Sequence, residues 1–416
     1  MWRPTAATFS ILCFLSSSCA WSVAPLQLDP GFSIAKVAAQ AKSLPSHSWE
    51  FGTATETLLE LYNLTYSVFG DTPFPVPTLT PSDVPSLAYA QENIVIGTGA
   101  NGLSDGDGAV GDPASLGVGA VMLGKTNETF AAVANEEIDY ILNDAPRFWN
   151  DAISQRSDVA ELWADFMYMA PPFMAYYAAD KGNASLLRET VRQCGLYRQI
   201  LKSNTTANYT GLWEHIVGPQ SADPGLWSTG NAWAAAGMAR VLATVIKAPI
   251  ARDTDWRSFA IADLTSWIRE ILDGAIAAPH VGGLLRNYLN DTSGDGHGFG
   301  EISGSSLLAS VSYRMAVLAP DTFGSKYTDW AESIRMTLGG TDADGNPHIT
   351  SDGIATPAVD PLDWLSTTPY TAGSPEGQNF VVLMYAAWRD WKTSDGASDS
   401  VRSSVRSLPF GGYHDK

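Results

Sequence analysis

Cysteine and long hydrophobic runs are the scarcest features of this sequence. Only three of its 416 residues are cysteine, namely Cys13, Cys19 and Cys194. Because the first two lie in an N-terminal segment that is expected to be removed, the mature chain cannot form an intramolecular disulfide. We expect Cys194 to be a buried, unreactive side chain on a helix. No segment has 18 uninterrupted apolar residues, so the sequence predicts no membrane-spanning helix.

Positive charge is also scarce. The chain has 25 lysine and arginine residues against 44 aspartate and glutamate residues, a net charge of -19. An acidic surface argues against nucleic acid, heparin-like polymers and anionic membranes as partners. We therefore expect no nucleic-acid partner and no membrane partner, and the sequence gives no sign of an obligate protein partner. A small anionic ligand in a local pocket is still compatible with this charge.

The sequence also lacks the signatures of metal and cofactor sites. No spacing of histidine and cysteine predicts a zinc site, and no glycine-rich loop is suited to bind phosphate. Three acidic segments resemble calcium-binding loops but depart from the twelve-residue ligand pattern, so we expect acidic turns at 105–108, 291–296 and 342–346. The prediction is no metal and no cofactor.

The N-terminus resembles a secretory signal peptide. Arg3 supplies the positive charge, residues 9–15 form a short apolar stretch, and residues 18–20 resemble a cleavage site. Six glycosylation acceptors agree with this route: Asn63, Asn127, Asn183, Asn204, Asn208 and Asn290. The sequence therefore predicts a signal peptide over 1–20 and a secreted, extracellular glycoprotein. Because no linker divides them, residues 21–416 are expected to form one domain.

Most of the chain has the apolar periodicity of helices. Leu264, Trp267 and Ile268 illustrate the spacing of three to four residues. Ser374 as N-cap and Pro375 as first helical residue mark one helix start. The expected helices are 33–43, 55–69, 87–92, 114–123, 130–142, 159–166, 172–180, 185–203, 232–246, 256–275, 305–318, 328–338 and 375–391. So many helices without alternating strands predict an all-α domain of packed helix hairpins.

One segment places a single carboxylate among aromatic side chains. Asp165 lies between Trp163 and Tyr168. Aromatic faces hold sugar rings, and apolar surroundings raise the pKa of a carboxyl group so that it can donate a proton near neutral pH. Because Pro171-Pro172 disfavour helix before them, we expect the helix carrying Asp165 to end near Tyr168. Asp165 is the candidate acid, and the alternative is a structural carboxylate that caps this break.

These segments resemble the (α/α)6-barrel glycosidases built from six helix hairpins. The resemblance is to the unsaturated glucuronyl and rhamnogalacturonyl hydrolases of glycoside hydrolase families 88 and 105, and it covers about residues 112 to 388. Residues 163–169 are similar to the segment carrying the family's catalytic aspartate, and 211–215 to the loop of a substrate-contacting histidine. Residues 227–233 resemble a Trp-x-Arg-Gly-x-x-Trp loop, and 301–305 a Ser/Gly segment entering a helix.

The resemblance implies which residues form the site. Asp165 matches the catalytic aspartate, and Asp112 occupies the place of a second one, although Asp112 is equally well placed to cap a helix beginning at Pro113. The implied substrate-binding residues are Trp163, Tyr168, His215, Trp227, Trp233 and Arg156. For the tryptophans the alternative is core packing, and for His215 a structural role. Thr229 stands where the family has an arginine, and Gln155 and Arg156 where it often has a histidine.

The implied reaction is hydration of a 4,5-unsaturated uronic acid, the sugar that a polysaccharide lyase leaves at a chain end. We expect a secreted hydrolase of unsaturated uronyl oligosaccharides derived from rhamnogalacturonan or pectin. One alternative is a related (α/α)6 hydrolase of ordinary glycosides, with Asp165 as acid and Asp112 or Glu301 as partner. The other is a non-catalytic carbohydrate-binding barrel that lost turnover with Thr229.

Overall fold

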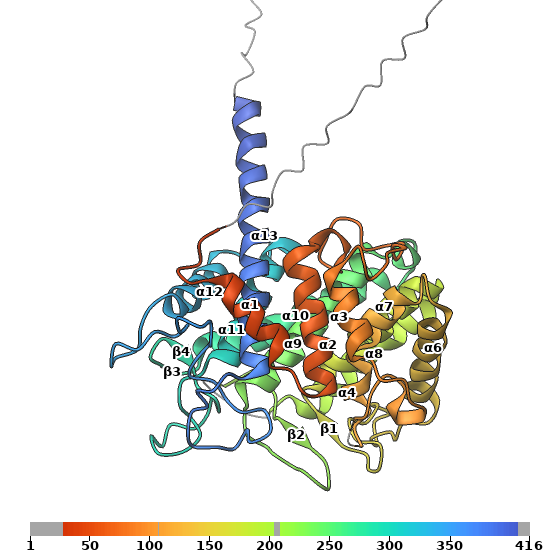
Figure 1. Ribbon diagram of the computed structural model, residues 1–416, viewed down its shortest axis with the longest axis horizontal. Coiled ribbons are helices and arrows are strands. Elements are labelled where there is room, and N and C mark those ends of the chain that lie inside the picture. Colours follow the sequence, from red (N-terminus) through yellow and green to blue (C-terminus); the bar gives the residue numbers. More distant parts are fainter. Residues whose placement is uncertain (1–27, 107, 204–208, 407–416) are drawn as a thin grey trace, which may run out of the picture.

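The computed structural model describes residues 28–106, 108–203 and 209–406, with side chains up to residue 394. Helices make up most of these ranges (Figure 1). No helix in them is long and apolar enough to cross a bilayer. The expected signal peptide and the acceptors Asn204 and Asn208 lie outside the described residues.

Six helices form an inner ring: α2 (Ser48–Tyr62), α5 (Gly117–Leu123), α7 (Phe166–Lys181), α9 (Ser228–Lys247), α11 (Ile302–Leu318) and α13 (Pro375–Arg406). Neighbours in this order pack against each other, and α13 packs against α2, which closes the ring. Six outer helices cover it: α1 (Ile34–Ser43), α3 (Pro85–Asn93), α6 (Glu128–Asn143), α8 (Ala184–Leu201), α10 (Arg257–Ala277) and α12 (Ser325–Leu338). The predicted (α/α)6 barrel is confirmed.

Burial separates the two layers. The inner helix α9 is buried on all sides, from Ser228 to Val245 without interruption. The outer helix α12 buries only one face, through residues such as Tyr327, Ala331 and Ile334. An outer helix needs one apolar stripe because its other side faces solvent, whereas an inner helix has neighbours all round. Cys194 is fully buried on α8, as predicted, and burial raises the pKa of its thiol.

Short elements connect the hairpins. Strand β1 (Leu162–Trp163) pairs antiparallel with β2 (Ile216–Val217), and β3 (His280–Val281) pairs with β4 (Leu284–Leu285). The remaining pieces are α4 (Gly111–Ala114) and the 3-10 turns η1 (Leu64–Tyr66), η2 (Gly99–Asn101) and η3 (Pro249–Ala251). Figure 1 shows β1 and β2 at the bottom of the view and β3 and β4 at the left.

The predicted helix over 159–166 and the predicted break near Tyr168 are both wrong. Residues 162–163 form β1, and α7 begins at Phe166 and continues through Pro171 and Pro172. Pro171 has no amide hydrogen, so the Met167 carbonyl loses its helical donor. The backbone of α9 packs tightly over this carbonyl, since a Cβ added at Gly237 would lie 1.8 Å from the Met167 oxygen. Tertiary packing therefore keeps the helix continuous.

The helix start predicted at Pro375 is confirmed. Ser374 precedes α13, and its Oγ accepts a hydrogen bond from the Gly377 amide at 3.3 Å. Proline fits the first helical position because its missing amide hydrogen would have no helical partner there.

A layer of buried charges lies inside the ring. Arg240 of α9 contacts both Glu56 and Glu60 of α2. Arg314 of α11 lies 2.7 Å from the second oxygen of Glu60 and also contacts Asp390 of α13. These ion pairs link four inner helices that are far apart in the sequence. Each buried charge has an opposite charge as partner, which offsets the cost of removing it from water.

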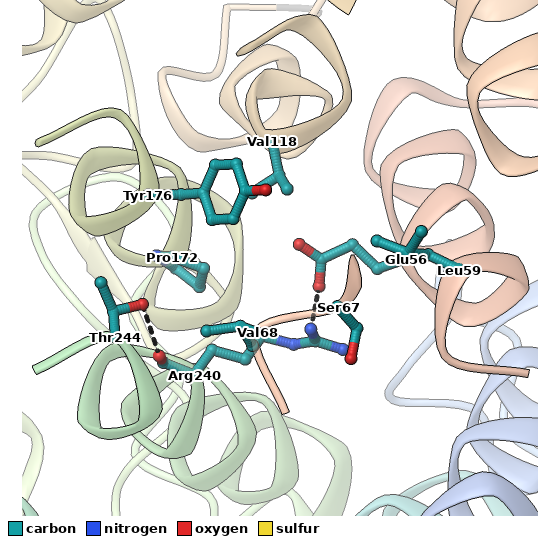
Figure 2. Close-up of a pocket in the computed structure, with 9 residues that line it drawn as sticks. All are labelled: Glu56, Leu59, Ser67, Val68, Val118, Pro172, Tyr176, Arg240 and Thr244. Carbon is teal, nitrogen blue, oxygen red and sulfur yellow. Dashed lines mark hydrogen bonds and ion pairs between the residues drawn. The ribbon is translucent and has the colours of Figure 1, made fainter. Parts of the chain in front are cut away.

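Figure 2 shows a small cavity beside this layer, where the Arg240 guanidinium faces Glu56 and Tyr176 lies on the opposite wall. Its volume is about 10 Å³. That is enough for a single water molecule. A sugar therefore cannot bind here.

Candidate active site

A larger cavity, of about 220 Å³, lies beside strand β1, whose Trp163 forms part of its wall. Aromatic rings and ionisable groups form much of its wall. The lining residues are His47, Trp49, Gly106, Asp112, Gln155, Arg156, Trp163, Asp165, Met169, His215, Trp227, Pro361, Leu362 and Trp364. A concave site with apolar walls and a few convergent polar groups is typical of small-molecule binding.

The strand pair β1–β2 places Asp165 beside His215. Trp163 pairs with Ile216, and the Ala164 amide donates a hydrogen bond to the His215 carbonyl at 2.9 Å. Asp165 then directly precedes α7, and its side chain makes no capping hydrogen bond. Its carboxylate stays available to the cavity and is 15 % exposed. The helix N-terminus favours negative charge at this point.

His215 lies between two carboxylates. Its Nε2 is 3.3 Å from Asp165 Oδ2, and its Nδ1 is 2.9 Å from Asp223 Oδ2. The side chain is only 1 % exposed, and its ring centroid lies 4.5 Å from that of Trp227. Burial alone lowers the pKa of His215, but the two carboxylates raise it by more, so the net shift is upward. The ring therefore keeps its positive charge to higher pH than an ordinary histidine.

Asp223 is held by three donors. Besides His215, the Tyr288 hydroxyl donates to Oδ2 and the Gly225 amide donates to Oδ1 at 2.9 Å. Burial raises the pKa of Asp223, but the hydrogen bonds from His215 and Tyr288 lower it by more, so the net shift is downward. Asp223 is therefore a carboxylate near neutral pH. Burial and this negative charge raise the pKa of Tyr288, which stays neutral.

The second candidate aspartate also faces the cavity. Asp112 lies inside α4, whose N-cap is Val110, so the capping role considered for Asp112 is wrong. Its Oδ1 accepts a hydrogen bond from Gln155 Nε2 at 2.8 Å. Gln155 stands in the stretch where the related enzymes often have a histidine. Next to it, Arg156 reaches the same cavity, with its Nε 3.6 Å from Asp158.

Six of the eight predicted site residues therefore line one cavity: Asp112, Arg156, Trp163, Asp165, His215 and Trp227. The structure does not bring Tyr168 and Trp233 into it. Tyr168 is buried, and its hydroxyl accepts a hydrogen bond from Arg240 at 2.8 Å in the charged layer. Trp233 is fully buried and packs against Tyr168 and Phe380. Both rings lie on inner-ring helices, which turn them toward the core.

Glu301 and Thr229 also lie outside the lining. Glu301 is the N-cap of α11, and its carboxylate accepts hydrogen bonds from the Ser303 and Gly304 amides. These bonds explain its position without any role at the cavity. Thr229 is buried in the first turn of α9. Its uncharged side chain cannot supply the positive charge that the arginine of the related loop carries at this position.

Trp364 and Asp223 are the main residues that sequence reasoning missed. Trp364 packs edge-on against His215 and Trp163, at centroid distances of 5.4 and 5.7 Å. It belongs to an irregular segment between α12 and α13 without a periodic pattern. Asp223 precedes Pro224 in the loop after β2, and aspartate is common in loops for local reasons. Neither position carries a signal that separates it from an ordinary loop residue.

The comparisons with known proteins agree with this architecture. A solved structure described as a possible member of glycoside hydrolase family 105 from Salmonella enterica serovar Paratyphi A aligns with a TM-score of 0.63 at 15 % identity, covering 86 % of this chain and 92 % of that one. A family 105 glycoside hydrolase from C. acetobutylicum aligns with a TM-score of 0.61 at 17 % identity, covering 86 % and 99 %. An unsaturated glucuronyl hydrolase specific for heparin aligns with a TM-score of 0.57 at 11 % identity, covering 88 % and 97 %.

At these identities the likeness shows the fold. No curated protein sequence matches the chain. The model of Glycosyl Hydrolase Family 88, however, matches residues 122–386, which is more than half of the chain and includes Asp165, His215 and Trp227. The chain therefore belongs to Glycosyl Hydrolase Family 88 and is a glycoside hydrolase.

Proposed function

We propose that this enzyme hydrolyses unsaturated uronyl oligosaccharides derived from rhamnogalacturonan or pectin, with Asp165 as general acid and base. The observation that carries the proposal is the Asp165–His215 contact of 3.3 Å at the wall of a cavity lined by tryptophans. A carboxyl group next to a buried histidine can give up and regain a proton, and aromatic faces can hold a sugar ring.

The proposed reaction adds one water across the C4=C5 bond of the substrate. Asp165 donates a proton to C4, which leaves positive charge at C5 that the ring oxygen shares. Water attacks C5 and returns a proton to Asp165, so the enzyme ends in its starting state. The product hemiketal opens and releases the remaining sugar. One acid/base residue is sufficient for this route, whereas ordinary glycoside hydrolysis uses two carboxylates.

The substrate carboxylate needs a cation in the site. Arg156 lines the cavity, and within the described part of the chain its ion pair is a long contact to the exposed Asp158. Guanidinium groups bind carboxylates through paired hydrogen bonds. We assign Arg156 to the substrate carboxylate, in the role that the missing arginine at Thr229 has in the related loop.

The test of this proposal is the ultraviolet absorbance of the conjugated double bond, followed while the enzyme acts on a lyase digest of rhamnogalacturonan. We expect the absorbance to fall with the wild type and to stay constant with Asp165→Asn, while calorimetry still detects binding of the oligosaccharide by the variant. Asp139→Asn, an exposed carboxylate on α6, is the matched control and should keep full activity. Constant absorbance with the wild type across rhamnogalacturonan, pectin and glucuronan digests would refute the proposal.

Asp112 favours one second candidate function. Two carboxylates, Asp112 and Asp165, line the same cavity, as hydrolysis of ordinary glycosides requires. Saturated oligosaccharides of the same composition separate the two reactions, because they lack the chromophore. Release of reducing ends from saturated substrates, without activity on unsaturated ones, would establish this second function.

We also propose that the protein is secreted and carries N-linked glycans. Asn127 and Asn183 are exposed, and each uses its Oδ1 to cap a helix, α6 and α8 respectively. A glycan is attached through the side-chain nitrogen, so these capping bonds are compatible with glycosylation. After expression through a eukaryotic secretory route, the protein in the medium should begin beyond residue 20 and lose mass on enzymatic deglycosylation. Retention in the cell at an unchanged mass would contradict this expectation.

A further inference from the structure

A line of contacts extends from the candidate acid into the protein: Asp165, His215, Asp223 and Tyr288. The geometry points to Asp223 and Tyr288 as positioning residues, which hold His215 as a charged donor against Asp165. Asp165 and His215 then share one proton, which the reaction uses. This inference deepens the proposed function and rests on it.

The backbone fixes the imidazole in place. The His215 amide donates to the Gly225 carbonyl at 3.0 Å, and its own carbonyl accepts from Ala164. Ile216 and Asp223 exchange two backbone hydrogen bonds, of 2.9 and 3.0 Å. Asp223 therefore cannot move away from the ring without breaking this small ladder. The Asp223 side chain reaches Nδ1, and Nε2 is left facing Asp165.

The charged groups around His215 determine the state of the ring. Asp165 faces Nε2 from the start of α7, and Asp223 faces Nδ1 from the loop after β2. The other close neighbours are the rings of Trp163, Trp227 and Trp364, which do not titrate.

More distant ionisable groups complete the surroundings. Asp112, Arg156 and His47 line the same cavity, and Tyr288 acts through Asp223. Glu214, the preceding residue, is half-buried, and burial and Asp223 raise its pKa. Two carboxylates thus accept from one imidazole, an arrangement that favours the doubly protonated ring.

The shared proton accounts for both halves of the reaction. In the resting state it lies on Nε2 of His215, and Asp165 is a carboxylate. When Asp165 protonates C4, the proton from Nε2 passes through its carboxyl group, and His215 becomes neutral while Asp223 still accepts from Nδ1–H. The water that adds to C5 returns one proton to Asp165, which passes it back to Nε2 of His215. Loss of this proton at high pH leaves the pair unable to start, so the alkaline limb of the activity profile belongs to the pair.

Two substitutions test this arrangement because they should shift the alkaline limb of the pH–activity profile in opposite directions. Asp223→Asn keeps the size of the side chain and an acceptor for Nδ1–H but removes the charge. The alkaline limb of kcat/KM should move to lower pH, by about 1 to 3 units, as expected for the loss of a neighbouring opposite charge. Tyr288→Phe removes a donor from Asp223, so the carboxylate binds Nδ1–H more strongly and the limb should move to higher pH.

The matched control is Tyr313→Phe. Tyr313 is a buried tyrosine whose hydroxyl also donates to a carboxylate, Glu332, at 2.9 Å, but it lies outside the cavity lining. Its substitution should leave the limb unchanged. Local loosening of the site would lower activity at every pH without opposite shifts. Shifts of the same sign in both variants, or no shift in either, would overturn the inference.

Titration of His215 in the free protein provides a second readout that needs no turnover. The ring carbon–proton signal, assigned with His215→Gln, should titrate at lower pH in Asp223→Asn and at higher pH in Tyr288→Phe. If no lyase digest is a substrate, the proposed function fails, and this titration still decides whether Asp223 and Tyr288 control the charge of His215. If Asp223→Asn does not fold, Tyr288→Phe alone gives the decisive sign.

Discussion

At the scale of single residues, the cavity depends on a few side chains with distinct roles. Among its described lining residues, Arg156 is the single arginine or lysine. The motifs of the sequence pointed to Asp165, His215 and Trp227 because these residues lie in short segments with a distinctive order. Trp364 could not be found in this way, since its contact with His215 spans about 150 residues of chain and depends on the closed ring.

Arg156→Met tests the assignment of the substrate cation. Methionine keeps the apolar stem and removes the charge, so binding should weaken while the acid at Asp165 is unaffected. We expect KM for the unsaturated oligosaccharide to rise about 10- to 100-fold with kcat nearly unchanged, which corresponds to the loss of one charged hydrogen-bond pair. Steady-state kinetics give both values.

Arg192→Met is the control for that experiment. Arg192 is exposed and pairs with Asp151 and Glu189, away from the cavity. Its substitution should leave both constants unchanged. A wild-type KM in Arg156→Met would show that another group binds the substrate carboxylate.

At the scale of elements, the periodic helices were predictable and the entry to α7 was not. Apolar spacing located the outer helices closely, for example 185–203 against the observed Ala184–Leu201. For α7 the local rule that proline breaks helices gave the wrong answer, because packing against α9 outweighs the lost hydrogen bonds. The predicted helix over 159–166 was wrong for a different reason. Strand β1 forms by pairing with β2, which is more than 50 residues away and leaves no local signal in the sequence.

Gly237→Ala tests this packing. The added methyl group would lie 1.8 Å from the Met167 oxygen, which belongs to backbone and cannot rotate away. Alanine favours helix by about 1 kcal/mol over glycine, but overpacking costs about 1 to 3 kcal/mol and more where backbone must move. We expect a net loss in the free energy of unfolding, measured by urea denaturation.

Gly195→Ala on α8 provides the contrast. Its nearest atom, 3.0 Å away, is the tip of the partly buried Trp267 ring, which can shift. The free energy of unfolding should change little or rise. An equal decrease in the free energy of unfolding for both variants would show that the contact of Gly237 with α7 has no special role.

At the scale of the whole molecule, buried ion pairs bind the ring across its interior. Arg240→Met leaves Glu56 and Glu60 without their shared cation inside the barrel. Removing one partner of a buried pair typically costs about 3 to 5 kcal/mol, and the free energy of unfolding should fall by about that amount. Lys326→Met breaks the exposed Lys326–Asp273 pair and should cost less than about 1 kcal/mol. Similar losses for the two variants would contradict a stabilising role of the buried layer.

The closure of the ring by α13 has a consequence for how the protein is made. Asn379 Nδ2 donates to the Ala41 carbonyl, and Arg389 donates to the carbonyls of Glu60 and Leu61, across more than 320 residues. During synthesis, α1 and α2 leave the ribosome long before α13, the helix against which they pack in the finished barrel. The hairpins can form early from local contacts, but the barrel must wait for its last inner helix. Until then Glu60 and the apolar walls of the incomplete barrel face water. We therefore expect the nascent chain to expose apolar surface until α13 has been synthesised.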